Sequence, residues 1–256
     1  MFLSIWKKEI KGELYTWKSM LWLVIASLIF SFTSYLLLTN KELSLLDQTE
    51  LMWLLAKIII GVALLIIAVD ASSIVNVEFE KETAESVFLS PISLADFLFG
   101  KLLASLTLWG AIFIVSIPYI VAVSAGSRLM WPFIGFVALL GTLGVVGFIF
   151  FIFGVSLLYR SSKNTITTAL IVLLAFATPA LFTSTLKNDI VSQVLSAINP
   201  VDNIFNSLDN VLVDYKTSLV QNWQFIVPLV VFALMTLAFL FFAMRRFERQ
   251  GIIKND

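Results

Sequence analysis

Six long apolar runs dominate this chain of 256 residues. A helix of about 20 residues crosses the roughly 30 Å hydrocarbon core of a bilayer, so each run is long enough to span one. In chain order they are Met20–Leu38, Leu51–Val69, Leu98–Val123, Trp131–Tyr159, Thr165–Thr183 and Trp223–Met244. Charged residues make up only 13% of the chain, whereas globular proteins have about a quarter. The sequence therefore predicts an all-α polytopic membrane protein with one transmembrane domain over residues 1–256.

The distribution of lysine and arginine predicts the orientation of these spans, because cytoplasmic loops are enriched in both residues. One side carries Lys7, Lys8, Lys11, Lys18, Arg160, Lys163, Arg245, Arg246, Arg249 and Lys254. The other side carries only Lys41, Arg128, Lys187 and Lys216. We therefore expect a prokaryotic cytoplasmic-membrane protein with both termini in the cytoplasm, which agrees with an even number of spans.

Residues 1–19 have the pattern of an amphipathic helix that lies in the cytoplasmic interface. Aromatic and aliphatic residues recur there every three or four positions, with lysines between them that face anionic headgroups. The residues that define this interfacial anchor are Trp6, Lys7, Lys8, Lys11 and Trp17. The simpler alternative is that the segment is only the flank of the first span.

Two polar stretches separate the spans, one on each side. The outer stretch, 184–222, contains two helical stripes of apolar residues with Asn199-Pro200 between them, which predicts two short amphipathic helices. The inner stretch, 77–97, crowds four glutamates around a lone lysine. Acidic residues contribute little to topology and face an anionic leaflet, so a basic protein partner explains the cluster better than the membrane does.

The inner stretch also carries the signals of a chain break and a helix start. Ser90-Pro91 interrupts the chain, and Ser93 with Asp96 three residues later forms a capping-box pattern before the third span. A push on this loop would therefore reach the inner ends of the second and third spans directly.

This loop resembles the loop between spans two and three of ABC-2 type permeases. Those proteins show an E-x-E-x-G-T-x-E run, a Pro-Val-Ser-like step and a Gly-Lys pair that enters span three. The matching residues here are Glu78, Glu80, Thr83, Glu85, Pro91, Ser93, Gly100 and Lys101, while Glu82 stands where glycine is usual. The resemblance extends to the whole chain as an architecture, and it implies the transmembrane subunit of an ABC exporter.

In that family the loop docks on a separate ATPase subunit, so the resemblance implies a coupling role for this loop. Residues Glu78, Glu80, Glu82, Thr83, Glu85, Pro91 and Ser93 would couple ATP hydrolysis to the spans. Gly100-Lys101 is not a phosphate-binding loop, because the other glycine and the Ser or Thr are missing. We therefore expect no cofactor in this chain, ATP and Mg²⁺ in the partner ATPase, and a second permease half, identical or related. Membrane lipids are the remaining expected contact, and we expect no nucleic acid.

The chain contains neither cysteine nor histidine. It therefore lacks thiolate nucleophiles, the usual general base and the commonest metal ligand. We expect a transport subunit and no enzyme. With few charges in the spans, the expected cargo is apolar or amphipathic: a small peptide, a drug-like molecule or a lipid-like compound.

A few residues inside the spans have two interpretations each. Lys57 either meets an anionic part of the cargo or snorkels to the outer surface near Glu50. Thr178-Pro179 either lines the pathway or only kinks its span. Asp70, at the inner end of the second span, is either an ion site or a boundary carboxylate that leads into the inner loop, and we favour the boundary carboxylate.

Two other classes of function remain as alternatives. An ion-coupled secondary transporter normally needs intramembrane carboxylates near the midplane, and Asp70 is expected to be peripheral. A non-transporting membrane scaffold or immunity protein is the third class. An ATPase gene beside this one would favour the exporter over both.

Overall fold

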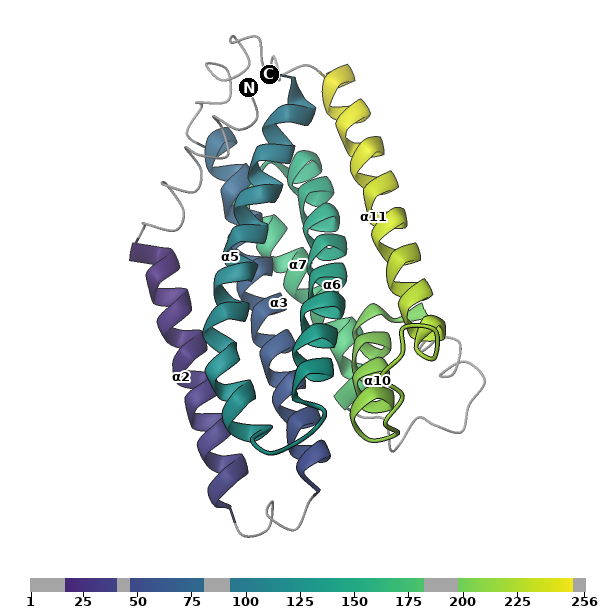
Figure 1. Cartoon of the computed structure of the whole chain (residues 1–256). Helices are drawn as coiled ribbons and strands as arrows, with labels where there is room; N and C mark the ends of the chain where they lie inside the picture. The colour runs from purple at the N-terminus through teal and green to yellow at the C-terminus, as the bar shows by residue number, and fades with distance from the viewer. Residues whose placement is uncertain (1–16, 41–46, 81–92, 182–197, 251–256) are drawn as a thin grey trace.

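The computed structural model describes residues 17–40, 47–80, 93–181 and 198–250. Within these residues the regular elements are all helices, and no strand is present. The helices are α2 Trp17–Thr39, α3 Gln48–Glu80, α5 Leu94–Val123, α6 Met130–Tyr159, α7 Ser162–Leu181, α10 Pro200–Leu212 and α11 Trp223–Gln250. In Figure 1 the long helices run along one bundle, and the short α10 lies beside the lower part of α6, at the lower end of α11.

Five of these helices are long and apolar enough to cross a membrane, which confirms the predicted membrane protein. They are α2, α3, α5, α6 and α11. The predicted fifth span overlaps α7, which is not among the five; its first turn is polar, and the segment that follows Leu181 lies outside the described residues. This fifth span, and with it the total of six, therefore stays a prediction. The predicted interfacial helix also lies outside the described residues, except that Trp17 and Lys18 belong to the first turn of α2.

Helix α3 is 33 residues long and continues through residues that the sequence analysis assigned to the inner loop. Ser72 and Ser73 donate to the carbonyl oxygens four residues earlier, and the amide of Asn76 does the same to Ser72. These bonds satisfy both serine hydroxyls and the amide nitrogen of Asn76 within the helix, so the helix tolerates these residues. Glu78 and Glu80 consequently lie in the last turn of α3, and the inner loop is shorter than 77–97.

Helices α6 and α11 run in the same direction and pack through glycines. The ring of Phe232 lies over Gly147 and the ring of Phe239 lies over Gly154. The two glycines are seven residues apart, as are the two phenylalanines, so both pairs use one face of each helix. Phe148 and Phe151 pack beside the same rings, with centroids 5.4 and 5.9 Å away. The absence of a side chain at the glycines lets the helices approach closely.

A side chain at Gly154 is therefore expected to destabilise the bundle. A Cβ atom there would lie 2.5 Å from a ring carbon of Phe239, whereas a Cβ atom at Gly135 in the same helix would meet nothing within 4 Å. Overpacking typically costs about 1–3 kcal/mol. We expect Gly154→Val to lower the free energy of unfolding by about that amount relative to Gly135→Val. Thermal unfolding of both variants in detergent checks this, and equal melting temperatures would contradict the packing.

Both ends of the bundle are linked by polar contacts between helices. At one end Gln48 donates to the carbonyl oxygens of Val123 and Ala125 after α5, at 3.0 and 2.9 Å. The other end contains Arg160, Lys163, Arg245, Arg246 and Arg249, and we call it the basic end. Helices α3, α6 and α11 finish there, and α5 and α7 begin there (Figure 1).

Candidate coupling site at the carboxyl end of α3

Asn76 joins α3 to two neighbouring helices near the basic end. Its side chain is fully buried, and its amide nitrogen, which also contacts the carbonyl oxygen of Ser72, lies within hydrogen-bond distance of the hydroxyl oxygens of Ser156 on α6 (3.2 Å) and Thr165 on α7 (2.9 Å). Buried polar groups are costly unless they are hydrogen-bonded, so the three side chains favour one relative placement of these helices.

Glu78 joins α3 to α5. Its carboxylate lies 3.6 Å from the ammonium nitrogen of Lys101, which is 1% exposed. The same ammonium lies 4.8 Å from the ring centroid of Phe97, within the range of a cation–π contact. A buried lysine of this kind needs a partner charge, and Glu78 provides it.

Glu80, the last residue of α3, holds the beginning of α7. Its carboxylate accepts a 2.6 Å hydrogen bond from the backbone N–H of Ser162, the first residue of α7. The first N–H groups of a helix have no intrahelical acceptor, and negative charge there is favourable. Glu80 therefore caps a helix that begins more than eighty residues later in the chain.

Aromatic contacts bring α11 to the same place. The rings of Phe79 and Phe247 lie 5.5 Å apart, and the guanidinium of Arg160 lies 4.7 Å from the ring of Phe247. Arg160 ends α6 in a left-handed conformation, with φ of 53°. The last turn of α3 thus contacts α5, α7 and α11, and Asn76 one turn earlier adds α6.

The predicted start of the third span is confirmed as a helix cap. The hydroxyl of Ser93 accepts a 3.1 Å hydrogen bond from the backbone N–H of Asp96 and donates to the carboxylate of Asp96 at 2.6 Å. Helix α5 therefore begins at Leu94, four residues before the predicted span.

The predicted coupling residues fall into two groups. Glu78, Glu80 and Ser93 are described, and they lie at the facing ends of α3 and α5. Glu82, Thr83, Glu85 and Pro91 lie outside the described residues. Their role stays a prediction.

The interfacial anchor and pathway residues are only partly described. Trp6, Lys7, Lys8 and Lys11 lie outside the described residues, and Trp17 is exposed at the start of α2. The hydroxyl of Thr178 bonds back to the carbonyl oxygen of Leu174, and Pro179 lies in the last turn of α7. These contacts are local and assign no pathway.

The structure buries Asp70, which its interpretation as a boundary carboxylate did not anticipate. Because α3 continues to Glu80, Asp70 lies ten residues inside the helix and is 1% exposed. Its carboxylate pairs with the ammonium of Lys18 on α2 at 3.2 Å. In Figure 1, α2 accordingly begins well below the basic end. The signal for this pair was a charged residue at the end of each of two apolar runs.

Lys57 is half-buried near the other end of α3. Its ammonium lies over the ring of Trp53, 3.4 Å from the centroid, and 5.4 Å from the ring centroid of Phe205 on α10. These contacts do not distinguish the two interpretations of Lys57, snorkelling and cargo contact, and both stay predictions.

The described residues hold no cluster of three or more acidic side chains that could ligate a metal ion. Compared with known proteins, the chain matches no protein-family model and no curated protein.

Proposed function

We propose that the chain is the permease subunit of an ATP-driven exporter of the ABC-2 type. The observation that carries this proposal is the carboxyl end of α3. Four other helices contact it through Asn76, Glu78, Phe79 and Glu80. A force applied to the segment after Glu80 would act on all of them together.

The proposed mechanism uses the rigidity of these contacts. The partner ATPase binds ATP and Mg²⁺ and contacts the acidic segment 77–97. Its movement displaces the ends of α3 and α5, and the bonds of Asn76 and Glu80 carry that displacement to α6 and α7. Packed helix interfaces have discrete arrangements rather than continuous ones, so a small displacement can switch the bundle between two states.

The remaining parts of the proposal follow the sequence. The basic end faces the cytoplasm, the predicted span Thr165–Thr183 at α7 is the fifth of six, and a second permease half completes the pathway. The cargo is apolar or amphipathic. The protein resides in the cytoplasmic membrane of a prokaryote, with both termini inside.

One observation favours the ion-coupled secondary transporter as a second candidate. Asp70 is a buried carboxylate within a helix that can span the membrane. Intramembrane carboxylates often mark ion pathways. Its pairing with Lys18 at 3.2 Å, however, gives the carboxylate a fixed structural partner. The exporter therefore remains the better-supported function.

Copurification tests the proposal. The chain is expressed with a candidate ABC ATPase from the same genome and purified through a tag on the chain. We expect the ATPase to copurify, and ATP to drive cargo accumulation in inverted vesicles that contain both subunits. Transport that follows a proton or sodium gradient without ATP would instead support the secondary transporter.

A further inference from the structure

Helix α10 packs across α3 and α6 at the end opposite the basic end. The indole N–H of Trp53 on α3 donates to the carbonyl oxygen of Phe205 on α10 at 3.1 Å. Gly144 of α6 leaves room for the side chain of Ile204 on α10. One face of α10 is therefore buried against the bundle, and the position of Phe205 beside Trp53 is defined.

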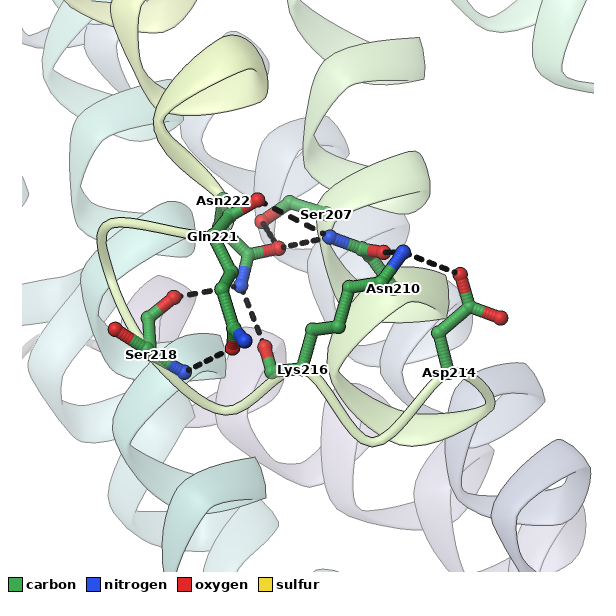
Figure 2. Close-up of polar contacts among 7 residues, drawn as sticks. All are labelled: Ser207, Asn210, Asp214, Lys216, Ser218, Gln221 and Asn222. Atoms are coloured by element: carbon green, nitrogen blue, oxygen red, sulfur yellow. Dashed lines mark hydrogen bonds and ion pairs between the residues drawn. The ribbon is translucent and has the colours of Figure 1, made fainter.

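The segment between α10 and α11 holds α10 in this place, as Figure 2 shows. The side-chain oxygen of Asn222 accepts from Asn210 (3.0 Å) and from Ser207 (3.3 Å) on α10. Its nitrogen donates to the carbonyl oxygens of Lys216 and Ser218. Asn222 is fully buried, so these bonds replace hydration that it has lost.

The ammonium of Lys57 lies 3.4 Å from the ring centroid of Trp53 and 5.4 Å from that of Phe205. Both distances lie within the roughly 6 Å range of cation–π attraction. Asp202 and Asp209 of α10 attract the same ammonium electrostatically. We call these five residues the ammonium site.

The charges of the ammonium site select cations. It combines two aromatic rings with two carboxylates of α10, whose charges attract the Lys57 ammonium. Aromatic faces with nearby carboxylates are the chemistry that proteins use for alkylammonium groups. An anion placed there would meet the negative faces of both rings and two negative charges.

We propose that the ammonium site binds the cationic head group of an amphipathic cargo, and that Lys57 occupies the site when cargo is absent. The side chains of four of its residues are partly exposed, namely Trp53, Lys57, Phe205 and Asp209. The long flexible side chain of Lys57 can leave the rings and expose its charge to water. Cargo recognition here presupposes the exporter function proposed above and specifies its substrate class.

Two probes with the same octyl tail and opposite charge test the proposal. They are octylammonium, whose head group is that of Lys57, and octyl sulfate. Binding is measured on the purified full chain in nanodiscs, with empty nanodiscs as the blank for lipid partitioning. We expect octylammonium to bind above the blank and octyl sulfate not to.

The variants test the role of each residue. Lys57→Met removes the internal occupant, so it is expected to tighten octylammonium binding by about fivefold. Phe205→Leu and Asp209→Asn remove part of the site and are expected to weaken that binding by a similar factor. Lys163→Met, an exposed lysine at the basic end, is the matched control and is expected to leave binding unchanged.

Several results would overturn the proposal: octyl sulfate binding that Lys57→Met abolishes, no octylammonium binding above the blank, or binding that no variant changes. If Lys57→Met does not fold, the proposal is tested by whether Phe205→Leu and Asp209→Asn weaken octylammonium binding. The measurement needs no ATPase. A failure to copurify an ATPase would therefore refute the exporter and leave this site standing, whereas lost binding with intact ATPase-driven transport would refute the site alone.

Discussion

Replacing Lys18 with methionine is expected to destabilise the bundle by about 3–5 kcal/mol, the usual cost of leaving a buried charge without its partner. The carboxylate of Asp70 lies 3.2 Å from the Lys18 ammonium, and the Asp70 side chain is only 2% exposed. Without Lys18 the carboxylate must stay charged in an apolar bundle, take up a proton or pull the helices apart.

Replacing the other partner, as in Asp70→Asn, should lower the stability much less, because the two partners are not equally buried. The Lys18 side chain is 41% exposed, so in Asp70→Asn its ammonium can turn towards water. We expect a loss of about 1 kcal/mol, the net value of an ordinary hydrogen bond. Lys18→Met combined with Asp70→Leu removes both charges and should recover most of the stability, since replacing a buried pair by apolar residues is often neutral.

Unfolding of the unmodified chain and these three variants in mixed micelles measures the differences in stability. Lys163→Met, at an exposed position, is the control for removal of a lysine charge alone. Equal losses in Lys18→Met and Asp70→Asn, or a double variant no better than Lys18→Met, would show that the ion pair does not exist as described.

Five of the six predicted spans coincide with helices that can cross a membrane, because long apolar runs have few alternatives in a membrane protein. The position at which α3 ends could not be predicted from the sequence. Ser72, Ser73 and Asn76 resemble loop residues in a hydropathy reading, yet each bonds to a carbonyl oxygen four residues earlier. Such bonds are as compatible with a helix as with a turn, and only the neighbouring helices decide between them.

The partners of the charged residues were also beyond the sequence. Lys18 and Asp70 lie in different helices, and so do Lys57 and Phe205. Periodicity reports which face of one helix is apolar, but it does not report which neighbour covers that face. The cap at Ser93 was predictable because both of its groups lie within one turn of a single helix.

Charge reversal at Glu85 is expected to weaken ATPase binding, which is the largest functional effect that the exporter proposal predicts. If the carboxylate pairs with a basic side chain of the ATPase, Glu85→Lys leaves that side chain facing a like charge. Breaking a buried interfacial pair costs roughly 2–5 kcal/mol, which corresponds to a loss of affinity of about 30-fold or more.

Two substitutions of Glu80 distinguish a role in ATPase contact from a role in coupling between helices. Glu80→Gln removes the charge but keeps an oxygen that can accept from the N–H of Ser162, whereas Glu80→Lys removes both. We therefore expect Glu80→Lys to lower transport per ATP hydrolysed more than Glu80→Gln does. A rim charge would contribute only a few tenths of a kcal/mol, so unchanged ATPase affinity in Glu80→Gln would place Glu80 outside the ATPase interface.

The control must be an acidic residue far from the coupling site and outside the ammonium site. Asp214 meets both conditions, since it is exposed and follows α10, whereas Asp209 interacts with Lys57. The measurements are pulldown affinity for the ATPase, ATP hydrolysis and vesicle transport in each variant. If Glu85→Lys and Glu80→Lys bind the ATPase and transport as Asp214→Lys and the unmodified chain do, then the segment after α3 does not couple to an ATPase. The contacts of Asn76, Glu78 and Glu80 would then serve only to hold the helices together.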